Sequence, residues 1–283
     1  MAKKKSLAEI HAAVVLFGLA GLFGKWLVLS PLIIVLGRVF FASLSLLLFF
    51  FVSKKNIAIS PPKNYGLFIF LGFILAVHWA AFFQSIQIST VAIGLLSYSS
   101  FPVFTAFLEP LFFREKLEVS AIFYALLCVA GIFLIIPRFD LDNTVYRGVL
   151  WGLSAGFTFS ILTLLNRKLT RTYSSLVITF YQDFWATLFL LPFFFILKPH
   201  LDSRDILLLL ILGIFCTALS HSLFIKGMRH IKAQTAAVIS SLEPVYGIVM
   251  ALIFLKETPS LRTVLGGIVI LGTAYAVTRK GAR

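Results

Sequence analysis

The chain has 283 residues, of which 60% are hydrophobic and only 13% are charged, and its mean hydropathy is +1.00. Soluble domains carry about 25% charged residues, so a water-soluble globule of this composition would expose apolar surface on most sides and aggregate. A formal charge of +14 also occurs in nucleic-acid-binding proteins, but those proteins are rarely so apolar. Cationic cytoplasmic loops between membrane spans explain both values. The composition therefore indicates a polytopic membrane protein surrounded by lipid, with no nucleic-acid partner.

Ten apolar runs are long enough to cross a bilayer, which requires about 20 residues each. In chain order they cover residues 8–29, 31–52, 65–86, 91–113, 119–136, 146–165, 175–197, 206–225, 234–255 and 261–277. The segment 43–52 is apolar on every face and lacks the alternation of a barrel strand. Both cysteines, Cys128 and Cys216, lie in apolar runs, which argues against a disulfide framework and a cysteine-rich metal site. The runs predict an all-α membrane protein with ten transmembrane helices and no metal or cofactor.

The connections between these runs differ in positive charge. On the side that holds both termini there are 17 Lys and Arg residues, and on the other side there are six. Because cytoplasmic loops are enriched in Lys and Arg, the count predicts that both termini lie in the cytoplasm and that the number of spans is even.

An internal repeat relates the two halves of the chain. With a shift of 142 residues, 96–115 aligns with 238–257, so that Pro102 matches Pro244 and Glu115 matches Glu257. Each repeat, expected at residues 1–142 and 143–283, holds five spans. Because five is odd, the second copy enters the membrane inverted, and inverted repeats are typical of transporters with a solute site near mid-membrane.

Residues 102–115 begin with Pro-Val-aromatic and end with Phe-x-Arg/Lys-Glu, and residues 244–257 repeat this pattern. The repeated pattern resembles the EamA repeat of the drug/metabolite transporter superfamily. The glycine-rich helices after each Glu are similar too. The resemblance covers nearly the whole chain and implies a carrier of two inverted five-helix repeats in the cytoplasmic (inner) membrane of a bacterium. It further implies that the N- and C-termini are both inside and that the usual activity is export of small metabolites. The motif identifies the fold and leaves the solute open.

Polar and aromatic residues inside the spans are the candidates for a solute cavity, since ionisable groups there are costly and usually face protein or water. Arg38 and Asp183 predict either a structural ion pair or a clamp on the solute. The two histidines predict either packing or proton exchange, and the aromatic residues either packing or stacking on the solute. The candidate set is Arg38, His78, Trp79, Phe82, Tyr98, Gln182, Asp183, His221, Ser240 and Glu243.

Glu243 stands out among these because its repeat mate is the apolar Phe101. A carboxyl group present in one half of a symmetric scaffold suggests a role in transport, either by carrying a proton or by binding a solute ammonium. A purely structural ion pair is the alternative. Glu109 lies nearer a membrane end, and we expect it to form a structural salt bridge with Arg114.

Two prolines fall inside the predicted fourth and ninth spans. A proline within a helix removes a backbone hydrogen bond, so Pro102 and Pro244 are expected to free the carbonyls of Tyr98 and Ser240. Each proline then acts either as a hinge or as a static kink. Glycines spaced four apart at 148, 152 and 156 permit close helix contact, within the chain or in a dimer, so a monomer and a homodimer both remain open.

These features favour a secondary transporter that works by alternating access on a small organic solute. The nucleotide-binding pattern Gly-x-x-x-x-Gly-Lys-Ser/Thr does not occur, so the energy would come from an ion gradient, such as protons, or from exchange against a solute gradient. The alternatives are an intramembrane enzyme or a channel-like helix bundle. The metalloprotease pattern His-Glu-x-x-His is absent, and we expect no enzymatic activity.

Overall fold

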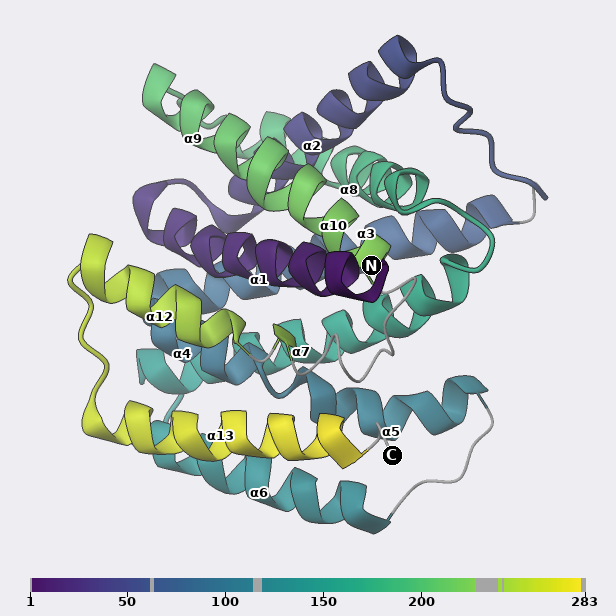
Figure 1. Ribbon diagram of the computed structural model, residues 1–283. Coiled ribbons are helices and arrows are strands. Elements are labelled where there is room, and N and C mark those ends of the chain that lie inside the picture. Colours follow the sequence, from purple (N-terminus) through teal and green to yellow (C-terminus); the bar gives the residue numbers. More distant parts are fainter. Residues whose placement is uncertain (1, 62–63, 114–118, 228–238, 241, 281–283) are drawn as a thin grey trace.

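The computed structural model describes residues 2–61, 64–113, 119–227, 239–240 and 242–280. All regular structure in these ranges is helical (Figure 1). The elements are α1 (Ala2–Trp26), α2 (Pro31–Ser53), α3 (Tyr65–Ile88), α4 (Val91–Tyr98), α5 (Phe101–Phe113), α6 (Val119–Ile135), α7 (Thr144–Leu169), α8 (Ser175–Leu197), α9 (Ser203–Gly213), the π-helical segment η2 (Ile214–Leu219), α10 (Ser220–Gly227), α12 (Glu243–Phe254) and α13 (Leu261–Lys280).

Seven helical segments of the described chain are long and apolar enough to cross a membrane, and three shorter apolar helices accompany them. Each corresponds to one of the ten predicted runs. In the seven segments, α4 and α5 count as one span, as do α9, η2 and α10. The expected all-α fold with ten helical spans is therefore confirmed.

The helices pack in a way that brings distant parts of the sequence together. Helix α3 packs against α7 and α8, α2 packs against α8, and α1 contacts both α10 and α12. Helices α6 and α13 lie side by side at one edge of the molecule (Figure 1). The largest cluster of buried apolar side chains is built mainly from α1, α2, α3, α7 and α8.

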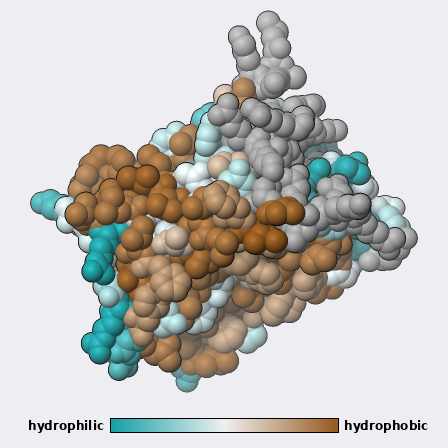
Figure 2. All heavy atoms as spheres, turned by 90° about the horizontal axis from the view of Figure 1, so that it is seen from below, coloured by the Kyte–Doolittle hydropathy of each residue, from teal (hydrophilic) through white to brown (hydrophobic). Residues whose placement is uncertain are grey.

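The outer surface is apolar, as contact with lipid requires. Large hydrophobic side chains such as Leu48, Phe73 and Phe195 are exposed. Figure 2 shows one face of the molecule, where hydrophobic residues form a broad area and hydrophilic residues gather at its edges. Such an area would drive aggregation in water, whereas in a bilayer it contacts acyl chains.

The fourth span differs from the prediction of a continuous helix with a proline inside it. Helix α4 ends at Tyr98, Ser99 and Ser100 form a turn, and Pro102 is the second residue of α5. Pro244 is likewise the second residue of α12, while residues 234–238 and 241 of the predicted ninth span lie outside the described residues. Proline is tolerated in the first turn of a helix, because the N–H that it lacks would have no partner there. The two prolines thus begin new helices.

The glycines of α7 pack inside the chain. A Cβ atom added to Gly148 would lie 2.5 Å from Ser89 Oγ, and one added to Gly152 would lie 2.5 Å from Ser97 Cβ. At Gly156 an added Cβ would lie 2.8 Å from the carbonyl oxygen of Tyr98. These small residues let α7 approach α4 closely, so this face is used by intramolecular packing.

Ion pairs connect the ends of several helices. Glu9 accepts a hydrogen bond from Lys226 at 2.7 Å, which joins α1 to α10. Glu109 of α5 pairs with Arg167 of α7, while its predicted partner Arg114 lies outside the described residues. The sequence indicated a structural ion pair for Glu109, but it did not indicate a partner on another helix.

Candidate functional site

The centre of the site is Arg38, a fully buried arginine in the middle of α2. Its Nε donates to Thr217 Oγ1 at 2.9 Å, and its Nη2 donates to the carbonyl oxygen of Cys216 at 3.2 Å. Among the described residues, its Nη1 has no hydrogen-bond partner. A buried guanidinium that leaves a donor unused is costly for stability, and this is the kind of cost that binding sites carry.

The π-helical segment η2 explains how a backbone carbonyl becomes available to Arg38. In an α-helix the amide of Ser220 would donate to the carbonyl of Cys216, four residues earlier. Here the Ser220 amide donates to the carbonyls of Phe215 and Thr217 instead. The carbonyl of Cys216 is thereby left to the Arg38 guanidinium. Single π-helical turns are frequent at functional sites for this reason.

Two aromatic rings stack beside the guanidinium. The Arg38 Cζ atom lies 3.4 Å from the centroid of the Trp79 ring, in the geometry of a cation–π contact. The Trp79 ring in turn stacks on His221, with centroids 5.7 Å apart and an interplanar angle of 20°. Helices α2, α3 and α10 thus contribute one residue each to a continuous column, and all three residues belong to the set predicted from the sequence.

Two buried carboxyl groups interact with the arginine of this column. Asp183 of α8 is fully buried and Glu243 of α12 is 2% exposed, and both interact electrostatically with Arg38. Within the described part of the chain, neither comes within 4.0 Å of a cationic nitrogen. Both oxygens of Asp183 also lack hydrogen-bond partners among the described residues. Arg38 and Asp183 therefore do not form the direct ion pair that was one of the two expectations.

The remaining predicted aromatic residues form one cluster around His78. The His78 ring lies 4.7 Å from Trp79, 5.7 Å from Tyr98 and 6.4 Å from Phe82, centroid to centroid. Its Nδ1 lies 2.9 Å from the carbonyl oxygen of Ala155 in α7. This contact ties α3 to α7 and fixes the orientation of the ring.

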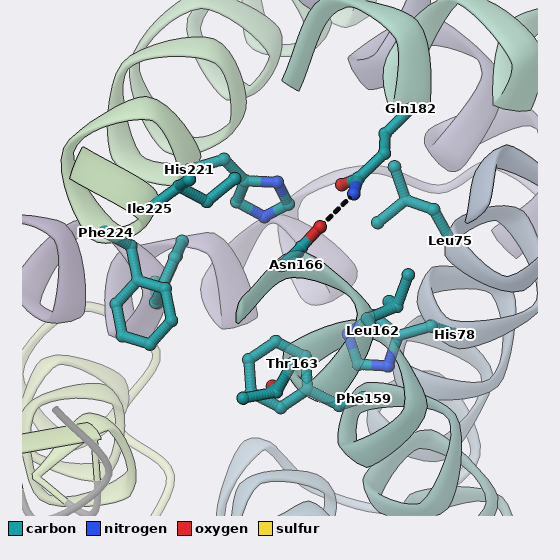
Figure 3. Close-up of a pocket in the computed structure, with 11 residues that line it drawn as sticks. Leu75, His78, Phe159, Leu162, Thr163, Asn166, Gln182, His221, Phe224 and Ile225 are labelled. Atoms are coloured by element: carbon teal, nitrogen blue, oxygen red, sulfur yellow. Dashed lines mark hydrogen bonds between the residues drawn. The ribbon is translucent and has the colours of Figure 1, made fainter. Parts of the chain in front are cut away.

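A pocket opens between α1, α3, α7, α8 and α10 next to this cluster (Figure 3). Its polar lining comes from His78, Thr163, Asn166, Gln182 and His221, and aromatic and aliphatic side chains complete it. The Gln182 amide donates to Asn166 Oδ1 across the pocket (Figure 3). The cavity offers about 20 Å³ to the centres of water molecules, room for about one or two waters. This space is too small for an organic solute.

The contacts given above bring together seven of the ten predicted cavity residues, and the carboxyl groups of Asp183 and Glu243 interact electrostatically with Arg38. Ser240 is buried and precedes Glu243 by three residues. The sequence did not single out Phe159, Thr163, Asn166 and Thr217, which line the pocket or bind Arg38. Asn166 and Thr217 are polar residues inside apolar runs, and this signal could have identified them.

A hydrolase-like pattern also occurs in α7. Residues 152–156 read Gly-Leu-Ser-Ala-Gly, which matches the Gly-x-Ser-x-Gly of serine hydrolases. That motif requires a sharp turn between a strand and a helix, whereas Ser154 lies within a helix, is exposed and donates to the carbonyl of Leu150 at 3.0 Å. The described residues also contain no group of three or more metal-ligating side chains. The pattern is therefore not a nucleophile site.

Comparison with known proteins agrees with this architecture. The chain is 27% identical to an uncharacterized transporter YxxF of Bacillus subtilis, with 98% of this chain and 92% of the relative aligned. It is 23% identical to the uncharacterized inner membrane transporter YicL of Salmonella typhimurium, with 99% and 97% aligned. A crystal structure superposes with a TM-score of 0.69 at 15% identity, covering 99% of this chain and 97% of the other. That structure shares the fold.

The model of one family matches the chain twice. The EamA-like transporter family aligns with residues 7–136 and again with residues 146–279, which together span nearly the whole sequence. The resemblance seen in the repeated proline motif is thereby confirmed, and the enzyme alternative is set aside because the family is one of transporters. The chain is a multi-pass membrane protein that belongs to the EamA-like transporter family.

Proposed function

We propose that this protein is a secondary carrier that exports a small organic solute across the cytoplasmic membrane of a bacterium by alternating access. The observation that supports this most is the buried Arg38, which stacks on Trp79 and lies beside a narrow polar and aromatic pocket. A static pore would keep a continuous path wide enough for its solute, whereas this pocket has room for only about one or two waters. Solute can reach such a site only if helices move.

Breaks in three spans provide places for that movement. The fourth span is interrupted at Ser99 and Ser100, the eighth contains η2, and α12 begins at Glu243 beside Pro244. Interrupted helices next to a central site are typical of transporters. We propose that Pro102 and Pro244 mark the hinges, and that the halves 1–142 and 143–283 move against each other as inverted repeats.

The 17-to-6 distribution of Lys and Arg supports an orientation with both termini in the cytoplasm. Under this orientation the Glu9–Lys226 and Glu109–Arg167 pairs lie toward the cytoplasm, and Lys25 lies toward the outside. Energy then comes from an ion gradient or from solute exchange.

The test is counterflow in liposomes that contain the purified protein. Liposomes are loaded with a radiolabelled mixture of amino acids, nucleosides and vitamins, and efflux is followed after dilution with and without unlabelled solute outside. A carrier gives saturable transport that external solute accelerates, and Trp79→Ala is expected to lower it at least tenfold. Gly272→Ala serves as the control, since no described atom lies within 4 Å of an added Cβ there. Linear transport without counterflow would indicate a channel instead.

A further inference from the structure

The charged groups buried beside the pocket do not balance. Arg38 supplies one positive charge, and Asp183 and Glu243 supply two carboxyl groups, all three at most 2% exposed. The two carboxyls both interact electrostatically with the same guanidinium. If both were ionised, the site would hold a net charge of −1 in a low-dielectric interior, which is strongly unfavourable.

The other titratable groups that face these three come from neighbouring elements. They are His78 of α3, Tyr98 of α4, Cys216 of η2 and His221 of α10. A second positive charge on either histidine would be repelled by Arg38, with which both interact. The missing positive charge must therefore come from something that binds to a carboxyl group.

We propose that Asp183 and Glu243 together hold one exchangeable proton opposite Arg38, and that a monocationic amine takes its place during transport. This inference rests on the proposed carrier function and names its solute class. On binding, the O–H bond of one carboxyl breaks, the proton leaves to water, and the carboxylate forms an ion pair with the solute ammonium. The site is neutral in both states, so each amine exchanges for one proton.

The surroundings of the carboxyls suit an organic cation. In the part of the chain that the structure describes, both oxygens of Asp183 are without hydrogen-bond partners, so Asp183 can accept from an ammonium group without breaking a described bond. The rings of Phe17, Phe159 and Phe224 line the pocket, and aromatic faces attract ammonium groups. The aromatic lining favours amines that also carry an apolar or aromatic part.

The number of protonated carboxyls can be counted directly by infrared difference spectroscopy of the purified protein without solute. At neutral pH we expect one protonated carboxyl per molecule in the wild type, and none in Asp183→Asn or Glu243→Gln, since the remaining carboxylate then balances Arg38. Arg38→Gln removes the positive charge and should raise the count to two. Arg38→Lys keeps the charge and the count of one, so it serves if Arg38→Gln does not fold. Glu109→Gln, which alters the surface pair with Arg167, is the matched control with a count of one.

A count of zero or two in the wild type, or a count in Arg38→Gln equal to that in Arg38→Lys, would overturn the shared proton. The exchange is tested by adding phenylethylammonium or methylammonium to protein in weak buffer with a pH dye. One proton released per amine bound is expected, with none from phenylethanol and none in Asp183→Asn. Amine binding without release, or no binding by either amine, would refute the exchange. Neither experiment measures transport. A negative result here would therefore refute the amine exchange without refuting the carrier function, which the counterflow assay tests separately.

Discussion

The substitution Gly72→Ala tests whether close packing of α3 against α8 holds the site together. A Cβ atom at position 72 would lie 2.3 Å from Trp185 Cβ, 2.9 Å from the amide nitrogen of Ala186 and 3.0 Å from the carbonyl carbon of Trp185. Ordinary contact begins at 3.4 Å, so the two helices must separate by about 1 Å. The obstructing atoms are Cβ and backbone atoms, which no change of side-chain rotamer can remove.

Overpacking of this kind costs about 1–3 kcal/mol, and a backbone clash belongs at the upper end. Alanine recovers up to about 1 kcal/mol through its higher helix propensity. The expected net loss is therefore about 2 kcal/mol, which corresponds to a fall in melting temperature of roughly 4–8 °C. Gly72 lies two helical turns before Trp79, and Trp185 lies two residues after Asp183. The separation should therefore also weaken solute binding.

The assay is thermal unfolding in detergent, with Gly66→Ala as the matched control in the same helix. Nothing lies within 4 Å of an added Cβ at Gly66, so this variant should melt at or slightly above the wild-type temperature. If Gly72→Ala melts within 1 °C of Gly66→Ala, the packing argument is wrong.

Three further predictions concern hinges, topology and helix-end charges. Pro102→Ala and Pro244→Ala should leave the melting temperature unchanged, because a proline in the first helical turn costs no hydrogen bond. Both variants should transport more slowly than the wild type, and a normal transport rate would refute the proposal that these prolines mark hinges. Cysteines introduced at the exposed positions Ser203 and Asn56 should react with an impermeant thiol reagent from outside only at Ser203, and the opposite pattern would invert the topology. Glu257→Gln removes the negative charge that lies 4.0 Å from Lys25 Nζ at the end of α1. Chemical unfolding should show a loss of less than about 1 kcal/mol in the free energy of unfolding, and a larger loss would contradict the view that solvent screens this ion pair.

The sequence alone determined the class of protein and the number of spans. Hydrophobic length, loop charge and an internal repeat are local or additive properties of the chain, so they do not depend on how helices pack. Most site residues were also found this way, because a polar residue such as Arg38 or Asp183 inside an apolar run is costly unless it has a role. The repeated proline motif was sufficient to indicate the family.

The partners of those residues were decided only by the tertiary structure. Arg38 donates a hydrogen bond to Thr217, which is 179 residues away. Thr217 lies in a π-helical turn that no local sequence pattern predicted. Glu109 pairs with Arg167 on another helix, although Arg114 is nearer in sequence. The break at Ser99 turned an expected kink at Pro102 into a helix start. In each case the outcome depends on which helices meet and at what height, and that is set by the packing of whole helices against one another.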